Sequence, residues 1–190
     1  MQYTDQQLIE RVESKAGGFE GWKRGVYLVA VRSNADKMDA FDDKAYVFEC
    51  KADGQRPDFA MVATCTTNAG SYGLKKFDKD GLPGCAVLKA DTIVYDSHHR
   101  LTHKGYKAYR QVKSFPYFRD SDKDDRAEQL GPEKSGVILA NIHRASPARV
   151  SSVIYNWSVA CIVLNNPNQF NALMAFANER PVSLCILQEF

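Results

Sequence analysis

The chain has 190 residues, of which 44% are hydrophobic and 25% are charged, and its formal net charge is +2. This length suits one domain with its own core, so we expect a single domain over residues 1–190. The nearly balanced charge argues against a nucleic-acid partner, which would need a strongly basic surface. No apolar run is long enough to predict a transmembrane segment.

Cysteine usage and the start of the chain bear on the compartment. The five cysteines are odd in number, widely spread and without a C-x-x-C pair, a pattern that favours reduced thiols over disulfides or a zinc site. The first residues, MQYTDQQLIERVESK, lack the apolar stretch of a signal peptide. We therefore expect synthesis in the cytoplasm without entry into the Sec pathway, no metal and no cofactor. The oligomeric state stays open.

Periodicity predicts a short N-terminal helix followed by a mainly β region. Leu8, Ile9 and Val12 share one side of a helical wheel, which predicts a helix over 5–17 that Gly17 and Gly18 end. From Gly25 onward, short apolar runs alternate with clusters of Gly, Pro, Asn and Asp. The expected strands are GVYLVAVRS, KAYVFEC, FAMVATCTT, GCAVLKA, DTIVYDS, YKAYRQV, GVILANIH, VIYNWSVACIVL and PVSLCILQEF.

These runs predict an α+β fold in which residues 25–190 form a β-sandwich or barrel. A second helix is expected over 167–177, after the cysteine-bearing strand, because Phe170, Leu173 and Met174 recur at helical spacing behind Pro167. The stretch TTNAGSYG lacks the glycine spacing of a nucleotide-binding loop, and no clear helix is expected after it.

A long polar loop is expected from Phe118 to Gly136. Asp120, Asp122 and Asp124 stand at alternate positions, as at the start of an EF-hand calcium loop. The pattern then fails, because Asp125 replaces the glycine at position six and Gly131 replaces the glutamate at position twelve. We expect a solvated acidic loop and leave open whether the three aspartates bind a cation.

The pattern that indicates chemistry lies in the last third of the chain. His143 ends one expected strand, and after a polar loop Ser158 precedes Cys161 by three residues at the start of the next. A thiol attacks a carbonyl as thiolate, and an imidazole is the usual base that activates it. Cys161 is thus a candidate nucleophile and His143 its candidate base. The backbone N–H groups of Ala160 and Cys161 are candidates for an oxyanion hole.

Ser158 is a candidate to orient the imidazole or the substrate. Trp157 precedes the candidate site and is a candidate stacking surface for a substrate. The competing interpretation is structural: a cysteine in an apolar run is more often a packed core residue, and a single histidine more often a satisfied polar group.

The order of histidine, loop and Ser-x-x-Cys resembles the catalytic signature of the L,D-transpeptidase (YkuD-like) family, a histidine in a strand followed by Ser-x-Gly-Cys. Other segments resemble uncharacterised tailed-phage and prophage proteins that carry a version of this signature. They are AFDDKAYVF, ATCTTNAGSYGL, GCAVLKA, YKAYRQV, FRDSDKD, NIHRAS, and WSVAC followed by NPNQFNALM. The resemblance implies a YkuD-like fold, peptidoglycan stem peptides as substrate, and a Cys161 thiol that is acylated and then released to an amine or to water.

Two residues depart from the family pattern. Ala160 stands where the signature has glycine, and alanine would be strained there if the backbone needed a positive φ. Val163 stands where an arginine is expected, which removes a possible carboxylate anchor. Arg144, next to His143, is the candidate to replace that arginine.

Three hypotheses follow from these residues. The first is a phage or prophage peptidoglycan hydrolase of the endolysin kind, or an L,D-transpeptidase-like acyl transferase, that reaches the cell wall through a holin-like partner or virion delivery. The second is a non-catalytic binding or virion-associated module on the same fold. The third is a cytoplasmic cysteine amidase or esterase.

Overall fold

The computed structural model describes residues 2–79 and 82–190. It is mainly β, with 39% of residues in strands and 15% in three helices. The expected mainly β, α+β class is therefore confirmed. No helix in the described part of the chain is long and apolar enough to cross a membrane.

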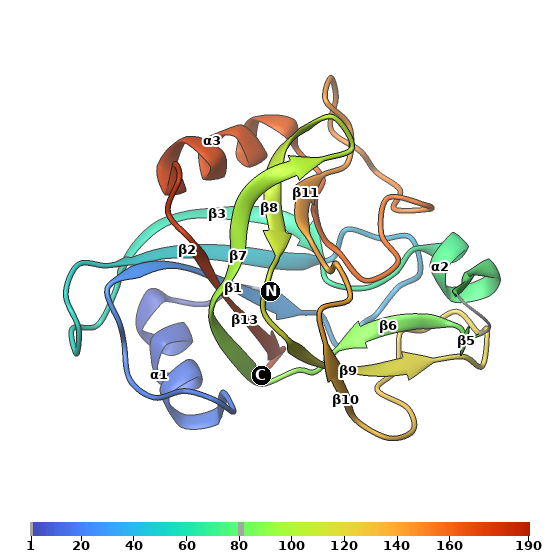
Figure 1. Cartoon of the computed structure of the whole chain (residues 1–190), viewed down its shortest axis with the longest axis horizontal. Helices are drawn as coiled ribbons and strands as arrows, with labels where there is room; N and C mark the ends of the chain where they lie inside the picture. The colour runs from blue at the N-terminus through green and yellow to red at the C-terminus, as the bar shows by residue number, and fades with distance from the viewer. Residues whose placement is uncertain (1, 80–81) are drawn as a thin grey trace.

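Eight strands close a barrel in the order β1-β13-β7-β8-β11-β12-β3-β2 (Figure 1). Their bounds are β1 Gly25–Arg32, β2 Asp43–Cys50, β3 Asp58–Thr66, β7 Thr92–His103, β8 Tyr106–Gln111, β11 Ile142–Arg144, β12 Ile162–Leu164 and β13 Val182–Gln188. A three-stranded sheet lies beside the barrel in the order β10-β9-β6, with β6 Cys85–Leu88, β9 Phe115–Asp120 and β10 Lys134–Gly136. The two short strands β4 (Asp78–Lys79) and β5 (Leu82–Pro83) pair with each other.

The two expected helices are present. Helix α1 (Asp5–Lys15) begins with a capping box between Thr4 and Gln7, and its buried side chains are those that the periodicity predicts. Helix α3 (Pro167–Ala177) has Asn166 as its cap and Pro167 in its first turn. It packs its apolar face against the barrel core. Both helices therefore cover the barrel with the faces that their sequences predict.

A third helix, α2 (Ser71–Lys76), follows TTNAGSYG, where no helix was expected. A Cβ on Gly70 would lie only 2.2 Å from the carbonyl oxygen of Tyr155, so the glycine lets this segment pack directly against the loop before Cys161. The small residues of this stretch therefore serve close packing beside the candidate site.

Strands β11 and β12 position the candidate site. They pair in parallel, with Ile142 opposite Ile162. Both isoleucines belong to the barrel core. Side chains alternate between the two faces of a strand, so Asn141, His143 and Cys161 are directed to the outside of the barrel wall. The Ser-x-x-Cys signature thus places its reactive groups on an outer face that loops, the small sheet and the end of α2 border.

Candidate active site

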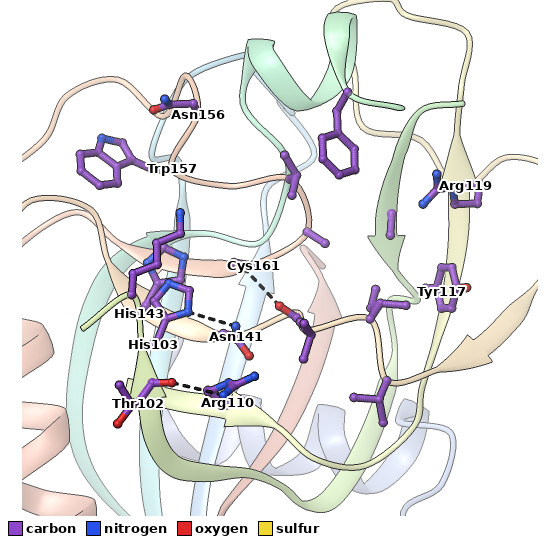
Figure 2. Close-up of a pocket in the computed structure, with 18 residues that line it drawn as sticks. Thr102, His103, Arg110, Tyr117, Arg119, Asn141, His143, Asn156, Trp157 and Cys161 are labelled. Carbon is purple, nitrogen blue, oxygen red and sulfur yellow. Dashed lines mark hydrogen bonds between the residues drawn. The ribbon is translucent and has the colours of Figure 1, made fainter. Parts of the chain in front are cut away.

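A pocket of about 790 Å³ lies outside the barrel wall at β11 and β12. Figure 2 shows Tyr117 and Arg119 on one side of it, His103 and His143 on the other, and Cys161 between them. The lining comprises Phe77; Ala86, Tyr117 and Arg119 of the small sheet; Thr102, His103 and Lys104 at the β7–β8 turn; Arg110 of β8; residues 137–139, Asn141 and His143; and Asn156, Trp157 and residues 159–161.

Cys161 lies at the floor of this pocket, and its side chain is nearly buried. Its thiol donates to the carbonyl oxygen of Leu139 at 3.6 Å (Figure 2). Burial raises the pKa of the Cys161 thiol to about 11, although the backbone N–H of Asn141 and the charge of Lys104 favour the thiolate. The resting thiol is therefore neutral at pH 7.

Leu139 holds its carbonyl in this position with a left-handed backbone, at φ 63°. Such a conformation costs a non-glycine residue about 1–2 kcal/mol. Non-glycine residues in this conformation are uncommon, and they cluster at functional sites. The backbone just before β11 thus aims an acceptor at the Cys161 sulfur.

The His143 ring has a defined neutral tautomer. Its Nδ1 lies 2.8 Å from the carbonyl oxygen of Arg144. A carbonyl only accepts hydrogen bonds, so we assign the proton to Nδ1, which leaves Nε2 with its lone pair. Burial lowers the pKa of His143 to about 4. The carbonyls of Arg144 and Trp157 favour the charged ring and partly oppose this shift. The imidazole is therefore neutral at pH 7, with Nε2 as its acceptor nitrogen.

Cys161 and His143 share one face of the sheet and one pocket. The register places Cys161 opposite Asn141, two residues before His143 on β11. No hydrogen bond joins the sulfur to the imidazole among the contacts of the described residues. With a neutral thiol and a neutral ring, the pair is not a resting thiolate–imidazolium ion pair. Any attack by sulfur must transfer its proton to a base as the new bond forms.

The turn before Cys161 has the expected donors. The backbone N–H groups of Ala160 and Cys161 have no acceptor among the described residues, and both residues line the pocket. Ala160 does not have a positive φ, so alanine is unstrained at the position where the family signature has glycine. The departure at Ala160 therefore leaves the turn intact.

Ser158 stabilises this turn. Its hydroxyl donates to the carbonyl oxygen of Cys161 at 2.9 Å, and its side chain is buried. The imidazole of His143 is instead oriented by the carbonyl of Arg144. The expectation that Ser158 orients the imidazole is therefore wrong, because its proton is already used within the Ser-x-x-Cys turn.

Val163, which stands where the family pattern has an arginine, and Arg144, the expected substitute for it, both lie outside the pocket. Val163 is fully buried in a small cluster with Cys161, Ala145 and Phe41. The guanidinium of Arg144 lies over the Tyr106 ring, 4.1 Å from its centroid. Arg144 follows His143 in the strand and therefore faces away from it. Its position gives no support to a role as the substitute anchor, whereas the expected Trp157 does line the pocket, about 39% exposed.

A second histidine, His103, was not predicted for this site. The N–H of Gln111 donates to Asn141 Oδ1 at 3.0 Å, which directs the amide nitrogen of Asn141 to His103 Nδ1, 3.3 Å away. The His103 ring stacks on His143 with centroids 4.6 Å apart (Figure 2). Burial, with Lys104 and Arg110, lowers the pKa of His103. Two stacked neutral imidazoles therefore line this wall of the pocket.

The sequence around His103 indicates only the turn that follows it. Lys104 and Gly105 both have a positive φ, as in the two-residue turns that favour β-hairpins. This turn explains why His103 ends β7. Nothing in the sequence indicates that the turn lies beside Cys161.

The acidic loop is shorter than expected, because β9 extends to Asp120 and β10 begins at Lys134. Asp120 is buried and accepts a hydrogen bond from the N–H of Glu128 at 3.0 Å. Burial raises its pKa to about 6. Carboxylate atoms of Asp122, Asp124 and Glu128 lie within 4.8 Å of one another. The side chain of Asp122 also contacts that of Asp120 and adds to the rise in its pKa, so the three aspartates of the EF-hand-like run lie close together.

No family model, curated protein or solved structure matches this chain. The resemblance to YkuD-like enzymes therefore remains a prediction from the motif.

Proposed function

We propose that this protein is a cysteine-dependent acyl transferase or hydrolase of YkuD-like architecture that acts on peptidoglycan stem peptides. The observation that supports the proposal is the shared pocket of Cys161, His143 and the two unpaired N–H groups of the Ser-x-x-Cys turn. A nucleophile, a base and oxyanion donors are the groups that acyl transfer requires.

The first half-reaction forms a thioester. The Cys161 sulfur attacks the carbonyl carbon of a peptide bond while Nε2 of His143 accepts the thiol proton. The N–H groups of Ala160 and Cys161 donate to the oxygen that becomes negative. The imidazolium then gives its proton to the departing amine as the C–N bond breaks. The acyl group remains on Cys161.

The second half-reaction releases the acyl group. A water or an amine attacks the thioester carbonyl, and Nε2 of His143 accepts its proton. As the C–S bond breaks, the imidazolium returns that proton to the sulfur. Water gives hydrolysis and an amine gives a new peptide bond. In a phage protein, hydrolysis is the useful outcome, with delivery to the wall by a holin-like partner or by the virion.

The neighbours of His143 suit this proton transfer. The carbonyls of Arg144 and Trp157 stabilise the imidazolium that forms during attack. Arg144 also fixes the ring so that Nε2 is the nitrogen that accepts. The Leu139 carbonyl orients the thiol hydrogen in the resting state. The charge that appears in the reaction is thus stabilised by fixed backbone dipoles.

The proposal is tested by turnover of a synthetic stem tetrapeptide, followed by chromatography and mass spectrometry. Cys161→Ala is expected to abolish product formation, and His143→Gln to lower its rate about 10²–10⁴-fold. Cys185→Ala is the matched control, because it removes another buried thiol from the outer face of a barrel strand. Equal turnover in Cys161→Ala would overturn the proposal.

A second candidate function is a stem-peptide binding module without turnover. The neutral resting thiol, with its pKa raised to about 11, and the lack of a hydrogen bond between its sulfur and the imidazole in the described chain favour it. It predicts that the tetrapeptide binds and remains uncleaved, and that Cys161→Ala leaves its affinity unchanged.

A further inference from the structure

The charge of the pocket is positive. Lys104, Arg110 and Arg119 line it, whereas no Asp or Glu does among the residues that the structure describes. The three cations come from three separate places: the β7–β8 turn, β8 and β9. The balanced net charge of the chain conceals this local excess.

Two of the cations lie on opposite walls. In the pairing of β8 with β11, Tyr109 is opposite Ile142, so Arg110 falls opposite Asn141 on the face that carries Cys161. Arg119 lies on the small sheet opposite Ala86, and its guanidinium donates to the carbonyl oxygen of Pro83 at 3.3 Å. Figure 2 shows Arg110 below Cys161 and Arg119 across the pocket. An anion between the walls is therefore near a guanidinium on each side.

The charges of Lys104 and Arg110 are not neutralised by neighbours. Arg110 donates to the carbonyl oxygen of Thr102 at 3.3 Å, and that dipole leaves its net charge in place. None of the ion pairs of the described chain includes Lys104 or Arg110. The charge of Lys104 reaches the site, since it lowers the pKa of His143 and of Cys161.

The size and rim of the pocket fit a peptide better than a small inorganic anion. Its volume of about 790 Å³ is that of a site for a small organic molecule. Val137, Leu139 and Trp157 are exposed apolar side chains at its lining. An acidic peptide would use both the guanidinium groups and these apolar surfaces.

We propose that this pocket selects an anionic peptide, whose free carboxylates are bound by Arg110 and Arg119 with Lys104 at the β7–β8 turn. As a statement about the substrate of the reaction, this inference rests on the proposed function. As a statement about binding, it rests on the positive charge of the pocket alone. Guanidinium groups pair with carboxylates through two parallel N–H donors, and an amide cannot replace the carboxylate charge. Stem peptides with amidated carboxylates are therefore poor ligands.

The binding test uses Cys161→Ala, which removes the thiol and hence turnover. Calorimetry compares the synthetic stem tetrapeptide carrying free carboxylates with the same peptide fully amidated. The free acid is expected to bind at least about tenfold more tightly, with an advantage that shrinks as salt is raised. When Arg110→Gln and Arg119→Gln are added to Cys161→Ala, the preference for the free acid over the amidated peptide is expected to fall below about threefold.

Lys107→Gln is the matched control, because Lys107 is an exposed cation of β8 that does not line the pocket. It is expected to keep the full preference. Circular dichroism and unchanged affinity for the amidated peptide show that the double variant is folded. Equal affinity for both peptides, no binding of either at millimolar concentration, or competition by inorganic phosphate without a preference for the free acid would overturn the inference.

A separate readout isolates the reaction. Intact-mass spectrometry of the unsubstituted protein measures acylation of Cys161 by each peptide. Preference for the free acid in binding without any acylation would overturn the proposed function and leave the anionic-peptide site standing. Equal acylation by the free and amidated peptides would support the function and overturn the site.

Discussion

The barrel contains two parallel strand pairs with different outer faces. Strands β1 and β13 pair over seven residues, and their outward side chains pack under α1 and its neighbours. Strands β11 and β12 pair over three residues, and beside them the outward side chains include His143 and Cys161. A strand that is covered by a helix on its outer side needs apolar residues on both of the strand's faces. A wall covered by loops leaves room for polar groups and a pocket.

Two buried cysteines illustrate the difference between the helix-covered and the loop-covered face of the barrel. Cys185 on β13 and Cys161 before β12 both face the outside of the barrel wall. Burial raises the pKa of both thiols. At Cys161, however, the N–H of Asn141 and the charge of Lys104 favour the thiolate, and the sulfur adjoins a pocket. Burial alone therefore does not distinguish a structural cysteine from a candidate nucleophile.

The largest expected effect is on thiol labelling. Iodoacetamide is expected to modify Cys161 at least about 100-fold faster than Cys185, because only Cys161 is reached from a pocket. Below its pKa of about 11, the Cys161 rate should rise roughly tenfold per pH unit, as the thiolate fraction does. Peptide mapping by mass spectrometry measures both rates. A plateau for Cys161 at neutral pH would instead show a resting thiolate–imidazolium pair.

The next effect is on the pH dependence of turnover. His143 must be neutral to accept a proton, and its pKa is lowered to about 4 by burial, with the stacked His103 and the charge of Lys104 adding to the shift. Activity is therefore present above about pH 4 and lost as the pH falls through that value. The profile of kcat/KM on the stem tetrapeptide measures this. An acid limb near 6.5, the ordinary value for histidine, would contradict the buried neutral ring.

A smaller effect is expected at the turn before Cys161. Ser158→Ala removes the hydroxyl that donates to the buried carbonyl of Cys161 and should cost about 1–3 kcal/mol of stability. Turnover should also fall, because the turn carries the Ala160 and Cys161 N–H donors. Urea unfolding and the tetrapeptide assay measure the two changes. A stable Ser158→Ala protein with full activity would show that the hydrogen bond does not position the turn.

The smallest effect is expected on the helix-covered side. Thr4→Ala removes the side-chain cap of α1 and should cost about 1 kcal/mol of stability. Turnover should stay unchanged, because α1 covers the other region of the barrel. The same two assays apply. A loss of activity larger than the loss of folded protein would show that the two regions are coupled.

Local patterns predicted the two longer helices and most of the strands. The expected strands GVILANIH and VIYNWSVACIVL, however, are largely irregular: only Gly136, Ile142 and His143 of the first and Ile162–Leu164 of the second lie in strands. The apolar spacing of Leu8, Ile9 and Val12 indicated α1, and Pro167 with Phe170 and Leu173 indicated α3. The long apolar runs of β1 and β13 were evident because both of their faces are buried. Helix α2 was missed, since its six residues depend on Gly70 packing against Tyr155, a contact between distant parts of the chain.

The site was predicted only in part, for the same reason. His143 and Cys161 lie close enough in sequence for their order to indicate a pair, and they do line one pocket. Arg110, Arg119 and His103 reach the pocket through strand pairings that no local pattern encodes. Arg144 was preferred as a cation because it adjoins His143 in sequence, although strand alternation turns neighbours to opposite faces.

The central claim is that Cys161 is a nucleophile that His143 deprotonates, and trapping the acyl-enzyme tests it most directly. The protein is mixed with the stem tetrapeptide, quenched in acid within milliseconds to seconds, and mapped by mass spectrometry. The account predicts an acyl group on Cys161 alone, formed more slowly in His143→Gln and just as fast in Cys185→Ala. Folded protein that binds the peptide and never carries an acyl group on Cys161 would contradict it.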